Sequence, residues 1–142
     1  MASVLTAWTT IPKVPGLVAA AVDYAAMRST KASTFGKFQL RLAAVPEKTE
    51  ITVMGYPGRL DGGQYMFKED PSISVSEATA YAAKAHPMYG GGASGGAWFL
   101  PTGDKAFEIF SVVSNGNPDV VNGPHFKHET EEMIEYVKGG CK

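Results

Sequence analysis

The sequence has a single cysteine, almost no net charge and no long hydrophobic run. Cys141 is the only cysteine among 142 residues, so no disulfide can form within the chain. We expect an exposed thiol there rather than a disulfide to a second chain. The longest apolar run, residues 17–22, is far too short to span a bilayer, and no basic segment precedes it near the start. We therefore expect no signal peptide in this chain and no membrane partner, and the cellular location stays open.

The charge balance excludes a further class of partner. The 13 basic and 14 acidic side chains leave a formal net charge of −1, so no basic face is available for nucleic acid. A hydrophobic content of 44% with 19% charged residues is typical of a chain that folds. The length suits one domain, residues 1–142, with a real hydrophobic core.

Glycine and proline, by contrast, are frequent, and they punctuate short apolar segments. The 16 glycines and nine prolines give the spacing of an all-β domain. The sequence predicts strands at 38–42, 50–54, 64–67, 98–100 and 107–113, with residues 38, 40 and 42 on a buried face. Turns are expected at 55–58, at a hairpin over Asp61-Gly62-Gly63, and at 101–104.

Two segments contain helix-forming residues. In residues 76–85 four alanines and a possible N-cap, Ser76, favour a helix, whereas the position between two hairpins favours a strand, which we prefer. The C-terminal segment is clearer, because glutamates at 129, 131 and 132 suit the positive end of a helix dipole. Apolar residues at 133, 134 and 137 form one stripe, and Gly139-Gly140 ends it. We expect one terminal helix.

The segment with the clearest chemical meaning is 89–98, Tyr-Gly-Gly-Gly-Ala-Ser-Gly-Gly-Ala-Trp. Glycines on both sides of Ser94 let the backbone turn sharply and aim its N–H groups at one bound atom. An acyl-transfer site needs this arrangement: an exposed hydroxyl and the amides of Gly92 and Ser94 converging on a developing oxyanion.

Four segments, in order, resemble the C-terminal part of trypsin/chymotrypsin-like serine peptidases. Asp23-Tyr24-Ala25-Ala26 resembles the segment that holds the family's triad aspartate, and Gly55-Tyr56-Pro57 the Gly-Tyr-Pro turn of microbial members. Gly92-Ala93-Ser94-Gly95-Gly96 resembles the G-x-S-G-G nucleophile loop, and Ser114-Asn115-Gly116 the strand edge that pairs with substrate backbone. The resemblance implies a chymotrypsin-like β-barrel, the second barrel plus an edge of the first, with a C-terminal helix. Most of the N-terminal barrel would be missing.

The resemblance also implies roles for individual residues. Ser94 would be the nucleophile and Asp23 the carboxylate that holds an imidazole in the correct tautomer. Gly92 and Ser94 would form the oxyanion hole. Substrate would be bound by Ser114, Asn115 and Gly116 through backbone pairing, and by Met88 near the base of an apolar specificity pocket. No cofactor and no metal are implied.

The family's catalytic histidine precedes the aspartate, but no histidine precedes Asp23 here. We interpret His86 as a structural residue. His125 and His128, with Glu131 and Glu132 following, would suit a metal site if all were helical, but a solvated helix start is the preferred interpretation.

Three hypotheses follow from the missing imidazole. The chain is a serine endopeptidase homologue that is inactive alone, or a pseudopeptidase that binds peptides along Ser114–Gly116. In the third, another chain or another copy completes a half-domain. A peptide or protein substrate is the expected partner in the first two.

Overall fold

The computed structural model describes residues 4–6, 20–21, 23–29, 38–103 and 106–140. Most of the regular structure in these ranges is strand, and an α-helix of 11 residues lies near the C-terminus. The strands are β1 (Val4–Thr6), β2 (Ala25–Met27), β3 (Gln39–Leu40), β4 (Thr52–Gly55), β5 (Phe67–Glu69), β6 (Ile73–Ser76), β7 (Ala80–Ala83), β8 (Ala97–Gly103), β9 (Ala106–Val112), β10 (Asn115–Gly116) and β11 (Val121–Pro124). The helices are η1 (Asp61–Gly63), η2 (His86–Met88) and α2 (His128–Lys138).

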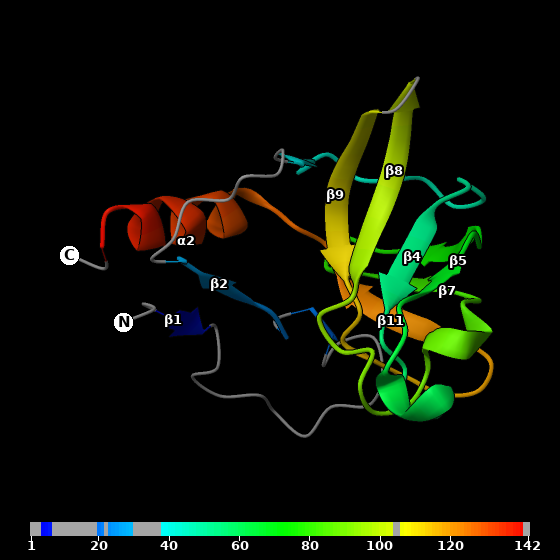
Figure 1. Ribbon diagram of the computed structural model, residues 1–142. Helices are drawn as coiled ribbons and strands as arrows, with labels where there is room; N and C mark the ends of the chain where they lie inside the picture. The colour runs from blue at the N-terminus through cyan, green and yellow to red at the C-terminus, as the bar shows by residue number, and fades with distance from the viewer. Residues whose placement is uncertain (1–3, 7–19, 22, 30–37, 104–105, 141–142) are drawn as a thin grey trace.

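These strands form two main sheets and one small one. The five-stranded sheet has the order β3-β9-β8-β4-β5, and the four-stranded sheet has the order β10-β11-β7-β6. All pairings are antiparallel except that of β3 with β9. Figure 1 shows α2 beside the separate β1–β2 pair, apart from the larger sheets. The expected all-β domain with one C-terminal helix is confirmed. Within the described ranges, no helix is long and apolar enough to cross a membrane.

Large side chains from both main sheets fill the core between them. Trp98, Tyr81 and Phe110 are each 0% exposed, and the ring of Phe110 meets the other two edge-on, 6.0 Å and 5.3 Å between centroids. Such edge-to-face contacts add to the stabilisation from burial. The buried hydroxyl of Ser111 donates to the carbonyl of Pro124 at 2.7 Å and so connects β9 to β11.

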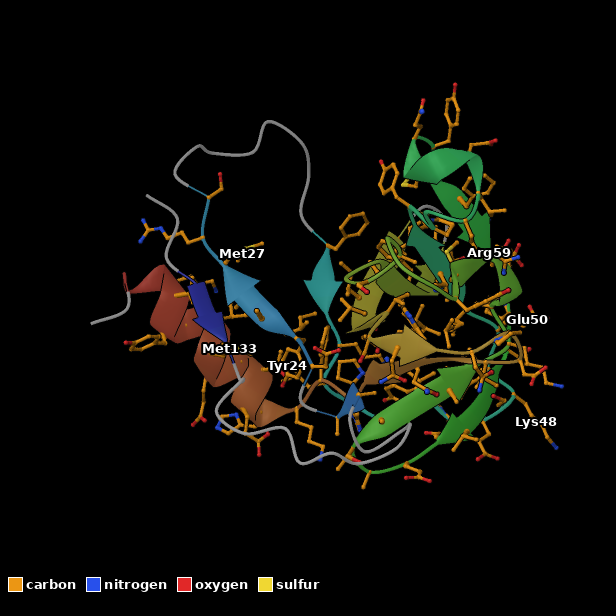
Figure 2. The ribbon with its side chains drawn as sticks, turned by 90° about the horizontal axis from the view of Figure 1, so that it is seen from below. Tyr24, Met27, Lys48, Glu50, Arg59 and Met133 are labelled. Carbon is orange, nitrogen blue, oxygen red and sulfur yellow. The ribbon has the colours of Figure 1, made fainter. Side chains whose placement is uncertain are left out.

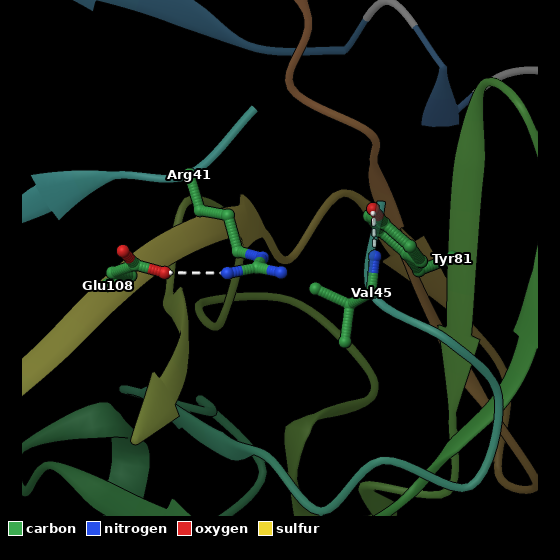
Figure 3. A network of polar contacts seen from close by, with 4 residues as sticks. All are labelled: Arg41, Val45, Tyr81 and Glu108. Carbon is green, nitrogen blue, oxygen red and sulfur yellow. Dashed lines mark hydrogen bonds and ion pairs between the residues drawn. The ribbon is translucent and has the colours of Figure 1, made fainter. Parts of the chain in front are cut away.

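A buried polar contact fixes the chain that leads from β3 into β4. The backbone N–H of Val45 donates to the hydroxyl of Tyr81 at 3.1 Å, and Arg41 pairs with Glu108 at 3.0 Å (Figure 3). Burial raises the pKa of the Tyr81 hydroxyl above its ordinary value near 10, because the phenolate would lie out of water. The bond from Val45 and the charge of Arg41 oppose this shift.

We expect stability to fall above about pH 10 and Tyr81→Phe to remove part of that fall. Because the pKa of Tyr81 is higher in the folded than in the unfolded state, its contribution to the free energy of unfolding is complete below the unfolded-state pKa. This contribution is lost as the pH rises through the folded-state pKa. At neutral pH the variant should lose about 1–3 kcal/mol, since a buried N–H loses its acceptor. Urea unfolding at several pH values measures both effects. Tyr65→Phe, at a residue 65% exposed, is the control that should change neither.

Three details of the predicted secondary structure and one of the predicted burial are corrected. The hairpin expected at 61–63 is replaced by the short helical turn η1, in which Asp61, Gly62 and Gly63 have left-handed φ of 45°, 64° and 73° and the N–H of Gln64 donates to the carbonyl of Asp61 at 3.3 Å. The strand expected at 64–67 therefore begins only at Phe67, after exposed Tyr65 and Met66. Residues 101–103 of the turn expected at 101–104 belong to β8, which extends to Gly103. Phe38 is 58% exposed rather than on a buried face.

The strands predicted at 50–54, 98–100 and 107–113 correspond to β4, β8 and β9, whereas the strand predicted at 38–42 is reduced to β3. Residues 76–85 are not helical: their centre is β7, paired with β6 and β11, and all four of its residues are buried. Small alanine side chains suit a strand that is covered on both faces. The terminal helix begins at His128 and buries Met133 and Val137. Cys141 and residues 17–19 and 22 lie outside the described residues.

Candidate functional site

Ser94 lies in an exposed turn between η2 and β8, and the backbone on both sides of it is held in place. The N–H of Gly95 donates to the carbonyl of Val113 at 2.8 Å, and Val113 donates back to Gly96 at 2.7 Å. On the other side, Gly58 donates to Gly91 at 2.8 Å. These bonds connect the loop to β9 and to the turn after β4. The serine is therefore presented on a rigid support.

Gly92 is required by the geometry of this loop. Its φ is +96°, and a Cβ there would lie 2.6 Å from the carbonyl oxygen of Tyr56 and 2.8 Å from the nitrogen of Gly58. Among the residues that the structure describes, no acceptor receives the N–H of Gly92 or of Ser94, and the Ser94 hydroxyl has no partner. Two donors and one nucleophilic oxygen are thus available to a ligand.

Asp23 is positioned by Ser114, which lies 91 positions later in the sequence. The hydroxyl of Ser114 donates to the Asp23 carboxylate at 2.6 Å, and the Asn115 amide donates to the same hydroxyl oxygen at 3.2 Å. The next residue, Tyr24, shares a hydrogen bond of 2.8 Å with Thr130 of α2. Figure 2 shows Tyr24 and Met133 on the side formed by β2 and α2, far from Arg59. The helix therefore anchors the segment that carries the carboxylate.

Three cavities meet at Ser94, which is the one described residue that lines all of them. The first, of about 570 Å³, also contains Asp23 and the apolar side chains of β2 and α2. The second, of about 300 Å³, lies toward Tyr56 and Phe99. The third, of about 250 Å³, lies toward Met88. Ser94 is therefore accessible from three cavities that are lined by different side chains.

The third cavity brings together the substrate-binding residues expected from the resemblance. Buried Met88 forms one wall, and half-buried Ser114 and Asn115 form another with Gly116. Asn115 and Gly116 make up β10, which is the outer strand of its sheet. An extended peptide can add to a sheet along such an outer strand.

The described lining of the first cavity contains no imidazole. His125 lies elsewhere: its Nε2 is 3.1 Å from the Leu42 carbonyl and its ring packs on Tyr81. His128 is exposed at the start of α2, 3.5 Å from Glu131 and 3.4 Å from Glu132. His125 precedes the helix, so the four residues do not share a helical face. Across the described ranges, no group of three or more potential ligands is arranged to hold a metal ion. His86 begins η2.

Sequence reasoning missed the second cavity and an exposed cation beside the site. Tyr56 belongs to the Gly-Tyr-Pro turn and Met66 to a segment predicted as strand, and both line the cavity beside Ser94. Arg59 stacks on the Tyr89 ring at 3.9 Å, next to the glycine loop. No sequence signal indicated this cavity. Tyr56 and Met66 are 49% and 58% exposed, and an alternating pattern does not reveal such exposure.

Comparison with solved structures shows a likeness to a serine protease. No family model matches the chain, and no curated protein is similar to it. Among solved structures it is similar to the thermostable serine protease AL20 from an extremophilic microorganism, with a TM-score of 0.54 and 25% identity. The match covers 67% of this chain and 45% of that one, so the chain spans less than half of that protease. The β-rich architecture with its terminal helix is therefore chymotrypsin-like.

Proposed function

We propose that this chain is a serine endopeptidase homologue that carries the nucleophile side of a peptidase site. The observation that carries the proposal is that Ser94 and Asp23, from distant parts of the sequence, line one cavity of about 570 Å³. The likeness to a solved serine protease supports it. No histidine is among the described residues that line this cavity, and we propose that the imidazole comes from outside these 142 residues.

The proposed reaction is hydrolysis of a peptide bond through an acyl-serine. An extended peptide pairs with β10, and the side chain before the scissile bond enters the cavity at Met88. Ser94 Oγ attacks the carbonyl carbon while an imidazole in the first cavity takes its proton. The N–H groups of Gly92 and Ser94 hold the oxyanion, and Asp23 orients the imidazole. The imidazolium then protonates the leaving amine, and water releases the acyl group.

The wall of the Met88 cavity indicates the class of residue that precedes the scissile bond. Its described lining carries no charged side chain, and Met88 and Val113 are apolar and buried. A buried charge without a partner is costly, so a basic or acidic side chain is disfavoured there. We propose neutral side chains of moderate size as the preferred substrates.

A second candidate function is peptide binding without catalysis. It is favoured by the outer position of β10, since backbone pairing needs no histidine. In the third hypothesis a second chain or copy supplies the missing barrel, and the apolar side chains of β2 and α2 in the first cavity would be its contact surface.

We expect an isotope-labelled chain to bind a short peptide that ends in a leucine carboxylate. Its carboxylate would accept from Gly92 and Ser94, and its backbone would pair with Gly116. Titration followed by amide NMR should shift the signals of these three residues, and amidation of the peptide's C-terminus should weaken binding about tenfold. Unchanged amide signals at all three positions would rule out both the peptidase and the peptide-binding function.

A further inference from the structure

A series of side-chain hydrogen bonds leads from the Asp23 carboxylate into the four-stranded sheet. Ser114 donates to Asp23 Oδ2 at 2.6 Å, and Asn115 Nδ2 donates to the Ser114 hydroxyl oxygen at 3.2 Å. Asn122 Nδ2 in turn donates to Asn115 Oδ1 at 2.8 Å. Asn115 and Asn122 are direct cross-strand partners in β10 and β11, so the register of this hairpin brings the two amides together.

All three donors point the same way, because the carboxylate fixes the direction. An ionised carboxylate only accepts, so the Ser114 hydroxyl gives it its proton and offers only lone pairs to Asn115. Asn115 therefore presents its amide NH₂ group to Ser114 and its side-chain oxygen to Asn122. If the Asn122 amide were turned over, two side-chain oxygens would face each other. The side chain of Asn122 thus sets the orientation of the next two groups.

Asn122 keeps this orientation although one of its own polar atoms is left unsatisfied. The residue is 6% exposed, and its Oδ1 has no hydrogen-bond partner among the described residues. A buried polar atom without a partner is destabilising, so its presence in a native fold calls for an explanation. Strand pairing does not supply one, because the backbone carbonyl of Asn122 already accepts from the Ser114 N–H at 2.9 Å, a bond that any residue would make.

We infer that Asn122 is a positioning residue of the proposed peptidase site: acting through Asn115, it holds the Ser114 hydroxyl proton on Asp23. The inference rests on the proposed function and adds to it two amides that the reaction itself does not use. With Oδ2 engaged by Ser114, Oδ1 is the oxygen that receives the imidazole N–H and so fixes the tautomer. Consecutive hydrogen bonds of this kind strengthen one another.

The same amides connect the carboxylate to the surface that binds the peptide. Asn115 belongs to β10, with which the peptide pairs, and it lines the cavity that also contains Met88. A peptide on β10 therefore covers Asn115 and excludes water from its bond to Ser114. Since hydrogen bonds are stronger away from water, the carboxylate is held most firmly when substrate is bound.

The test follows the hydroxyl proton of Ser114 in the 142-residue chain. Its exchange with solvent is measured by NMR, from the deuterium isotope shift on the serine Cβ, in the wild type, Asn122→Leu, Asn115→Leu and the double variant. Leucine is close to asparagine in size but neither donates nor accepts, and the backbone bond between Asn122 and Ser114 is kept. Thr52→Val is the matched control: Thr52 is 7% exposed, lies in the five-stranded sheet and also loses a 2.6 Å bond to a carboxylate, that of Asp70.

We expect the Ser114 hydroxyl to exchange about tenfold faster in Asn122→Leu than in the wild type, because the Asn115 amide can then rotate. Asn115→Leu should have at least this effect. The double variant should exchange like Asn115→Leu, since Asn122 acts only through Asn115. Thr52→Val should lose stability but keep the wild-type exchange rate. In a form of the protein that supplies an imidazole, Asn122→Leu should lower kcat by about the same factor and leave KM unchanged.

The outcomes separate this inference from the function on which it rests. Wild-type exchange or wild-type kcat in Asn122→Leu, additive effects in the double variant, or equally fast exchange in Thr52→Val overturns the inference and leaves the proposed function standing. A peptide that ends in a leucine carboxylate tests the proposed function by itself. If this peptide shifts none of the wild-type amide signals of Gly92, Ser94 and Gly116, the proposed function fails and the inference fails with it.

Discussion

In a form of the protein that supplies an imidazole to the first cavity, Ser94→Ala will lower kcat for peptide hydrolysis by about 10³-fold or more. The reason is that the acyl-enzyme route needs an oxygen nucleophile, and under the proposed function the Ser94 hydroxyl is that nucleophile. KM should change little, since alanine keeps the loop and the Met88 cavity. The assay is the initial rate on a fluorogenic peptide with a neutral residue before the bond. The form to use is either a longer native product of the gene or a mixture with the completing chain.

Two further variants make this result specific. Ser72→Ala, at an exposed serine outside the three cavities, should leave kcat unchanged. Asp23→Asn should lower kcat strongly without removing peptide binding, because the imidazole loses the acceptor that fixes its tautomer. The 142-residue chain alone should show only background hydrolysis. Full activity in Ser94→Ala would refute the nucleophile assignment, and binding without turnover in the completed form would favour the peptide-binding function.

Local patterns were enough to predict several strands and the helix, but not pairings between distant segments. The apolar segment 107–113 and the turn residues before it predict the hairpin of β8 with β9, because both signals lie within one short stretch. Nothing in the sequence indicates that Gln39–Leu40 runs parallel to β9, since about half of the sequence separates the two segments. The positive φ at Asp61 shows the other limit: a glycine pair permits both a hairpin and a helical turn, and the surrounding contacts decide.

The candidate site likewise contains residues that a local motif predicts and residues that only the fold brings together. Ser94 and Gly92 can be identified from ten consecutive residues, because the glycine pattern itself sets the backbone geometry. Asp23 was singled out by resemblance, and its bond to Ser114 joins residues 91 positions apart. The second cavity, lined by Tyr56 and Met66, forms only where the turn after β4, the segment before β5 and β8 come together in the fold. No periodic pattern in the sequence predicts that these three segments lie together.

Gly92→Ala should weaken binding of the peptide that ends in a leucine carboxylate about tenfold, because the carboxylate loses its charge-assisted hydrogen bonds. A Cβ at this position would overlap the carbonyl oxygen of Tyr56 and the nitrogen of Gly58, and its φ of +96° disfavours any side chain. Both obstructing atoms belong to the backbone, so a change of rotamer cannot relieve the overlap. The loop itself must move, and the N–H groups of Gly92 and Ser94 move with it.

The overall fold should survive Gly92→Ala, since the buried core around Trp98 takes only Ala93 from this loop. Amide NMR titration measures the lost binding, and thermal unfolding separates it from global destabilisation. Gly140→Ala is the matched control: its φ is +82°, nothing lies within 4 Å of a Cβ there, and it follows α2, away from the three cavities. This control should lose about 1 kcal/mol of stability from backbone strain and keep peptide affinity. If Gly92→Ala binds the peptide like the wild type, with the Ser94 amide still responding, then these amides are not the oxyanion donors and the loop is only a turn.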